Sequence, residues 1–160
     1  MRVQRVFSEA QFVFIFPLRD RFYTYDGFLE AVGSYPLFCD DKGRHFTNKR
    51  LLSDDEVCKR ELSMLFAHFN QETGANDPNS GVPLWRQGLA HTAEWNCKAP
   101  QTGIQRGVCD YKSGASSWAT EAFPPQGRKH YYGRGPLQIS WNYNYGYFSK
   151  VISDDVMYLL

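Results

Sequence analysis

The sequence predicts a mainly α-helical domain with long irregular loops and a small extended element. Three observations indicate this class: a strongly patterned helix over residues 53–72, shorter helical patterns before it, and a Gly-, Ser- and Pro-rich stretch over residues 96–126. A chain of 160 residues fits one domain. It can bury about two-thirds of its unfolded surface in a core. We therefore expect a single domain over residues 1–160.

Two short helices are expected near the beginning of the chain. Ser8 can cap a helix that runs through Phe12. A second helix is expected over residues 25–32, where apolar side chains fall on one face and Gly33 follows as a stop signal.

The clearest helical signal begins at Ser53. Ser53 and Glu56 have the spacing of a capping box, and Asp54 and Asp55 place negative charge in the first turn. Apolar residues then recur at helical spacing, at Cys58, Leu62, Leu65, Phe66 and Phe69. The helix is expected to run to about Glu72, because Gly74 is a common helix stop.

Glu72 is expected to leave this helix close to its buried face, because it follows Leu65 by seven residues. A carboxylate at the end of an apolar face is costly unless it is paired or has a chemical task. The alternative is a glutamate that bends into water at a frayed helix end.

The middle of the chain is predicted to be a loop, a second helix and a long excursion. Residues 74–83 read as the loop and residues 84–95 as the helix, with Glu94 near its end. The excursion over residues 96–126 is long enough to need a function or a cross-link. Cys97 and Cys109 bracket part of it and could form a disulfide; the alternative is two unpaired thiols.

The last third of the chain predicts a tight turn followed by an extended segment. Residues 131–136 contain two glycines and a proline, and residues 137–141 alternate between apolar and polar. Four neutral polar residues then recur at every second position: Gln138, Ser140, Asn142 and Asn144. Such a face, flanked by Tyr and Trp, suits sugar hydroxyls and amides; the alternative is an edge strand with a solvated face.

Composition excludes several classes of partner. The net charge of +1, from 18 basic and 17 acidic residues, gives little attraction for nucleic acid. The longest apolar run, residues 12–16, ends at Pro17 and is too short for a membrane span or a signal peptide. We therefore expect a chain that is cytosolic, already processed or incomplete at its start. The four cysteines form no C-x-x-C pair, so no metal site is expected.

Two glutamates have positions that suit glycoside hydrolysis. This reaction needs one protonated carboxyl that donates to the leaving oxygen and one ionised carboxylate that activates water. Glu72 is the better acid, Glu94 the better base, and Ser140 could help to hold the water. Glu61 and Glu121 are competing candidates.

Residues 131–146, YYGRGPLQISWNYNYG, closely resemble the hallmark segment of family 19 chitinases. Three other segments resemble the family in the same order: residues 12–25, residues 59–73, which lead to Glu72, and residues 85–94, which lead to Glu94. The resemblance spans nearly the whole chain.

This resemblance implies a fold, a reaction and a set of site residues. The fold is mainly α-helical and lysozyme-like, with two lobes around a cleft. The reaction is the inverting, endo-acting hydrolysis of β-1,4 links in chitin, without a cofactor or metal, by a secreted and monomeric protein. Glu72 falls on the acid, Glu94 on the base and Ser140 on the serine that shares the water. The substrate-binding positions are Gln71, Tyr131, Gln138, Tyr143 and Asn144.

Three departures from the family pattern lead to further expectations. Gln71 stands where the family usually has His, which changes the electrostatics beside Glu72. A family cysteine before residue 131 is replaced within residues 123–125, so we expect Cys97 to pair with Cys109. The chain stops at Leu160, where we expect the C-terminal part of the second lobe to be missing.

These departures leave other functions open. One is a chitin-binding or lysozyme-like relic that no longer cleaves, and another is a fragment that does not fold alone. A third is a peptidoglycan hydrolase, against which the near-zero net charge favours chitin.

Overall fold

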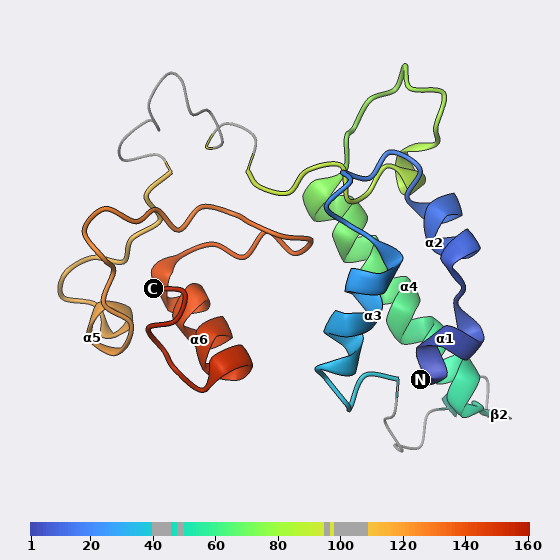
Figure 1. Cartoon of the computed structure of the whole chain (residues 1–160), viewed down its shortest axis with the longest axis horizontal. Helices are drawn as coiled ribbons and strands as arrows, with labels where there is room; N and C mark the ends of the chain where they lie inside the picture. Colours follow the sequence, from blue (N-terminus) through green and yellow to red (C-terminus); the bar gives the residue numbers. More distant parts are fainter. Residues whose placement is uncertain (40–45, 48–49, 95–96, 98–108) are drawn as a thin grey trace. The chain divides into compact units, whose positions relative to one another are not determined.

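The computed structural model describes residues 1–39, 46–47, 50–94, 97 and 109–160 (Figure 1). The described part of the chain is mainly helical, which confirms the predicted class. Its elements are α1 (Arg2–Val6), α2 (Glu9–Ile15), α3 (Tyr25–Gly33), β1 (Phe46–Thr47), β2 (Arg50–Leu51), α4 (Asp54–Thr73), η1 (Leu84–Arg86), α5 (Trp118–Ala122) and α6 (Asn142–Ser153). The chain divides into two compact units, Met1–Ala90 and His91–Leu160.

Helix α4 is the central element of the first unit, and its start follows the predicted capping box. The Ser53 hydroxyl accepts a hydrogen bond from the Glu56 N–H at 3.3 Å, and the Glu56 carboxylate accepts one from the Ser53 N–H at 2.9 Å. Helices α2 and α3 also begin where the sequence indicates, at caps provided by Ser8 and Thr24. Local signals therefore determine three of the helices in this unit.

The core of the first unit is a cluster of aromatic rings around α4. The Phe66 ring centroid lies 4.9 Å from that of Phe7 and 5.2 Å from that of Phe16. Helix α1 is tied to the start of α4 by an ion pair between Arg2 and Asp54 at 2.8 Å. A disulfide between Cys39 and Cys58 links the segment after α3 to α4. Because exposed ion pairs contribute little, buried aromatic surface and this cross-link hold the unit together.

The second unit has more irregular backbone than helix in its described residues, and its core is small. Phe123, Tyr131, Tyr145 and Leu160 form the buried cluster. Helix α6 packs closely against the end of α5, because a Cβ added at Gly146 would lie 2.3 Å from the Phe123 ring. Helix α5 lies inside the stretch that was expected to be irregular throughout, and its Ser117 cap gives its start. Residues 98–108 of that stretch lie outside the described residues.

Strand content in the described residues is limited to a short hairpin and isolated bridges. In the hairpin, Phe46 pairs with Leu51 and Thr47 with Arg50. The bridges join Ala93 to Arg134 and Arg134 to Ile139. None of the helices found in the described residues is long and apolar enough to cross a bilayer.

Candidate active site

Glu72 and Gln71 lie in the last turn of α4, and both side chains are exposed. The expectation that Glu72 projects with the buried face is wrong. The buried face passes through Leu62, Phe66 and Phe69 and ends at Thr73. The Glu72 carboxylate has no hydrogen bond or ion pair to any other described residue, so it is free to contact a ligand.

Thr73 fixes the end of α4 against residues 89 and 90. Its hydroxyl donates to the Phe69 carbonyl and accepts from the Leu89 N–H at 2.8 Å. The Ala90 N–H donates to the Thr73 carbonyl at 3.0 Å. Glu72 therefore stands on a helix end that is anchored immediately beside it.

The helix expected over residues 84–95 is wrong beyond its first turn. Within residues 84–94, which the structure describes, only η1 forms, because the backbone after it makes long-range hydrogen bonds instead of helical ones. The Ala75 N–H donates to the Gln87 carbonyl at 3.0 Å, and the Asp20 N–H donates to the Leu89 carbonyl at 2.8 Å. Glu94 consequently lies on irregular backbone at the start of the second unit.

The Glu94 carboxylate is half-buried and accepts two hydrogen bonds. The Tyr111 hydroxyl donates to Oε1 at 2.8 Å, and the Gly133 N–H donates to Oε2 at 3.3 Å. Hydrogen bonds to a carboxylate stabilise its charge and fix its orientation. The pKa of Tyr111 is raised, first by its hydrogen bond to Glu94 and then by burial. This arrangement suits an ionised base.

Backbone pairing brings the segments of Glu94 and Ile139 to either side of the segment that contains Arg134. Ala93 pairs with Arg134, and Arg134 pairs with Ile139, both in the antiparallel sense. The Glu94 N–H donates to the Gly133 carbonyl at 2.8 Å, which continues the first pairing by one residue. The second pairing shifts after Ile139, because the Trp141 N–H donates to the Tyr131 carbonyl at 2.8 Å. A Cβ at Gly133 would also lie 2.8 Å from the Gln138 Oε1 atom.

The backbone around this site is unusual in the second unit. Tyr111, Gln138 and Trp141 all have positive φ, at 47°, 46° and 73°. Such values are uncommon for non-glycine residues and concentrate at functional sites. They also explain why the expected extended run over residues 137–141 is wrong: residues 135–138 form a turn, and α6 begins at Asn142.

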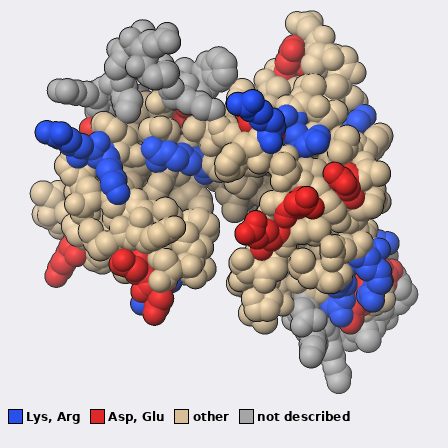
Figure 2. All heavy atoms as spheres, viewed as in Figure 1, with Lys and Arg blue, Asp and Glu red and all other residues tan. Residues whose placement is uncertain are grey.

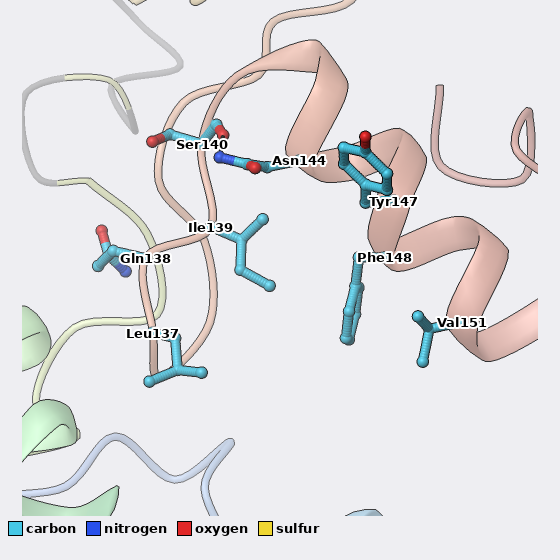
Figure 3. Close-up of a pocket in the computed structure, with 8 residues that line it drawn as sticks. All are labelled: Leu137, Gln138, Ile139, Ser140, Asn144, Tyr147, Phe148 and Val151. Atoms are coloured by element: carbon cyan, nitrogen blue, oxygen red, sulfur yellow. Dashed lines mark hydrogen bonds between the residues drawn. The ribbon is translucent and has the colours of Figure 1, made fainter. Parts of the chain in front are cut away.

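Three of the predicted polar residues border one cavity of about 410 Å³, which lies against α6 (Figure 3). Gln138, Ser140 and Asn144 are its polar lining residues, although the Gln138 side chain points away from α6 in Figure 3. Its remaining wall is apolar and consists of Leu137, Ile139, Tyr147, Phe148 and Val151. The Asn144 amide donates to the Ser140 carbonyl at 2.9 Å, which joins the start of α6 to the preceding loop.

Two predicted polar or aromatic residues serve the core instead. Asn142 is fully buried; its amide group accepts from the Ser113 N–H at 2.8 Å and donates to the Phe123 carbonyl at 2.6 Å. Tyr131 is 1% exposed, and its hydroxyl accepts from the Gln126 N–H at 2.8 Å. The expectations that Asn142 shares a solvent-facing polar row and that Tyr131 contacts sugar therefore do not fit this structure. Tyr143 is half-buried between two tryptophan rings.

The competing glutamates and the cysteines also have defined places. Glu61 accepts a hydrogen bond from the Cys39 N–H at 2.7 Å, which is a structural role, and Glu121 is exposed on α5. The predicted disulfide between Cys97 and Cys109 is confirmed.

Tyr111 is the site residue that sequence reasoning missed. It lies in the irregular stretch between two chain segments and belongs to none of the motifs that drew attention. Its only sequence signal is its position two residues after Cys109, whose disulfide returns the chain to the vicinity of Glu94.

Comparison with known proteins gives the family. The family model described as chitinase class I, glycoside hydrolase family 19, matches residues 18–158. The chain belongs to family 19. Endochitinase A2 from Pisum sativum is 34% identical over 136 residues, which cover 85% of this chain and 34% of that protein. Chitinase 4 from Oryza sativa subsp. japonica is 37% identical over 134 residues, which cover 84% of this chain and 34% of that protein.

Solved structures of family 19 proteins have the same fold. The class IV chitinase from Zea mays aligns with a TM-score of 0.63 at 28% identity, over 98% of this chain and 62% of that one. Chitinase C from Streptomyces griseus HUT6037 aligns with a TM-score of 0.60 at 32% identity, over 91% of this chain and 53% of that one. This family 19 chain spans about a third of the length of the curated relatives it matches.

Proposed function

We propose that this chain carries the acid–base pair of an endo-acting chitinase, which hydrolyses β-1,4 links between N-acetylglucosamine units with inversion. The observation that carries this proposal is the pair of hydrogen bonds that hold the Glu94 carboxylate. This carboxylate is held by the Tyr111 hydroxyl and the Gly133 N–H, and Ser140 follows Ile139, which pairs with Arg134 next to Gly133. A base that activates water needs a fixed carboxylate and a second polar group for the water.

In the proposed reaction, Glu72 is protonated and Glu94 is ionised. The oxygen of a water molecule attacks the anomeric carbon, and its proton passes to Glu94 while Ser140 helps to orient it. The bond from the anomeric carbon to the glycosidic oxygen breaks, and that oxygen takes the proton of Glu72. An inverting enzyme needs the two carboxyl groups about 6.5–9.5 Å apart, so that water fits between them. That separation is a prediction for this chain, because Glu72 and Glu94 belong to different units.

Three polar groups at the cavity support a neutral sugar as the ligand. Gln138, Ser140 and Asn144 offer hydrogen-bond donors and acceptors without formal charge. The face in Figure 2 carries both signs of charge on each unit, with no continuous field of one sign. These features favour chitin over an anionic wall polymer. The two disulfides fit an oxidising compartment, so we propose that the protein acts outside the cytosol, and we expect a monomer.

The test is hydrolysis of a soluble chitin hexamer, with product anomers followed by NMR. We expect new reducing ends in the α configuration, and we expect Glu72→Gln and Glu94→Gln each to lower turnover at least a hundredfold. Glu121→Gln is the matched control, because Glu121 is an exposed glutamate outside the proposed pair. Unchanged turnover in Glu72→Gln, or β-anomer product, would overturn the mechanism.

A binding protein that no longer cleaves is the second candidate, and two observations favour it. Glu72 is exposed in this structure, and Gln71 stands where the family usually has His. Glu72 at the exposed end of α4 has no ion-pair or hydrogen-bond partner among the described residues that would assist a proton transfer. Retention of the folded chain on chitin without release of soluble product would support this function.

A further inference from the structure

A row of four aromatic rings leads away from Glu94 in the second unit. The row begins at Tyr111, whose hydroxyl holds the Glu94 carboxylate. The Tyr111 ring meets Trp141 edge-on at 5.5 Å, Trp141 stacks on Tyr143 at 6.1 Å, and Tyr143 lies 5.9 Å from Trp118. The rings are therefore successive neighbours that connect a proposed catalytic group to a distant tryptophan.

The far end of this row is open to solvent. Trp118 is 62% exposed and Trp141 is 38% exposed, whereas Tyr143 between them is half-buried. Large aromatic side chains usually bury most of their surface, so a contiguous exposed group of them marks a binding surface.

The backbone that carries Trp118 is held firmly, so its exposure does not result from a loose loop. Ser117 caps α5 through the Thr120 N–H at 3.2 Å. The Thr120 hydroxyl donates to the Gly114 carbonyl at 2.6 Å and lies 2.7 Å from the Ser113 hydroxyl. Ser113 is in turn bonded to the buried Asn142 at the start of α6. A chain of hydrogen bonds thus fixes the tryptophan beside Tyr143.

We propose that Trp118, with Tyr143 and Trp141, forms an additional subsite that binds N-acetylglucosamine units beyond those at Glu94. The substrate class rests on the function proposed above. A β-linked N-acetylglucosamine ring has its substituents in equatorial positions, which leaves two flat faces of C–H groups. These faces pack on aromatic rings, and the hydroxyl and acetamido groups at the edge stay hydrated. Trp118 therefore sets a preference for longer chains.

Neutral polar residues beside the row favour a sugar chain over a protein partner. Trp141 follows Ser140 directly, and Tyr143 precedes Asn144, so two rings of the row are sequence neighbours of neutral hydrogen-bonding residues. A protein partner would be expected to bury a larger and more apolar surface without using these groups.

The experiment compares Trp118→Ala with Trp85→Ala, a matched control in the first unit that is 60% exposed. Binding of N-acetylglucosamine trimer and hexamer is measured by calorimetry in the Glu72→Gln background, which prevents cleavage. We expect Trp118→Ala to raise the Kd for the hexamer about five- to tenfold and the Kd for the trimer much less. Trp85→Ala should change neither value. Trp118→Phe should keep most of the affinity for the hexamer, because an aromatic face remains.

Several outcomes would overturn the subsite. These are hexamer binding by Trp118→Ala that equals the parent, an equal loss in Trp85→Ala, an equal loss for trimer and hexamer, or a parent chain that binds neither sugar. Thermal unfolding of Trp118→Ala controls for folding, and we expect an unchanged midpoint.

The failure of the proposed function would look different. If the wild-type chain releases no product but Trp118→Ala weakens hexamer binding selectively, the hydrolase fails and the subsite stands. If the wild-type chain cleaves the hexamer and Trp118→Ala leaves binding and KM unchanged, the subsite fails and the hydrolase stands.

Discussion

The two glutamates of the proposed pair are supported in opposite ways. Glu72 projects from the last turn of a regular 20-residue helix, and its carboxylate is exposed. Glu94 lies on irregular backbone, and its carboxylate is held by a phenol and a backbone N–H. An acid must release and regain a proton in contact with substrate, whereas a base must keep its charge and direction. A regular helix end is sufficient to present the proposed acid Glu72. The proposed base Glu94 requires tertiary contacts that hold its carboxylate.

The largest effect is expected where the second unit depends on a single buried amide. Asn142→Ala removes the partners of the Ser113 N–H and the Phe123 carbonyl, and we expect a loss of about 3 kcal/mol in the free energy of unfolding. Urea unfolding, with hydrogen exchange of peptides from each unit, locates the loss. Asn144→Ala on the same helix is the control and should cost less than about 0.5 kcal/mol, because Asn144 is exposed. A loss below about 1 kcal/mol in Asn142→Ala would contradict this dependence.

A smaller loss is expected at the end of α4 in the first unit. Thr73→Val leaves the buried Leu89 N–H without its acceptor, so we expect about 2 kcal/mol of destabilisation. Ser63→Ala is the matched control, because Ser63 donates to the carbonyl four residues earlier in the same way but is exposed. Equal effects in the two variants, measured by urea unfolding, would show that the contact with Leu89 contributes nothing.

The support of Glu94 is tested by removing one donor. Tyr111→Phe should lower kcat on the chitin hexamer about tenfold, equal to about 1.4 kcal/mol, with little change in KM, because the carboxylate loses its orientation. Tyr35→Phe, at an exposed tyrosine of the first unit, should leave both constants unchanged. A rise in KM alone would mean that Tyr111 binds substrate and does not position the base.

The smallest effect is a pH dependence of stability in the first unit. Burial, with a contribution from Asp20, raises the pKa of Tyr23 to about 12. Because the folded pKa lies above the unfolded value of about 10, this stabilisation is present below pH 10 and is lost as the pH rises towards 12. We expect a loss of about 1 kcal/mol between pH 8 and pH 10.5, and Tyr23→Phe should remove that part of the decline. Parallel curves for the two proteins would exclude Tyr23 as the source.

The difference between the two units also explains what the sequence can predict. Helices α2, α3 and α4 are marked by side chains within one turn of their first residues, so Ser8, Thr24 and Ser53 are visible as local signals. The helix expected after residue 84 fails because Thr73 and Asp20, distant in sequence, take up the hydrogen-bonding groups of residues 89 and 90. Whether Glu72 is buried or exposed depends on which residue ends the buried face, and that residue is its immediate neighbour Thr73. Tyr111 could not be predicted, because its contact with Glu94 requires a fold that no local pattern encodes.

The disulfide between Cys97 and Cys109 has a consequence for the chemistry of Glu94. Glu94 and Tyr111 are 17 residues apart along the chain, but the disulfide joins points three residues after the first and two residues before the second. Because the disulfide already closes the loop between residues 97 and 109, little further entropy is lost when Tyr111 meets Glu94. The Tyr111 phenol therefore remains at a high effective concentration near the Glu94 carboxylate. Composition and length of residues 98–108 can then change during evolution without separating the pair. Reduction of this disulfide is therefore expected to weaken the hold of Tyr111 on the Glu94 carboxylate.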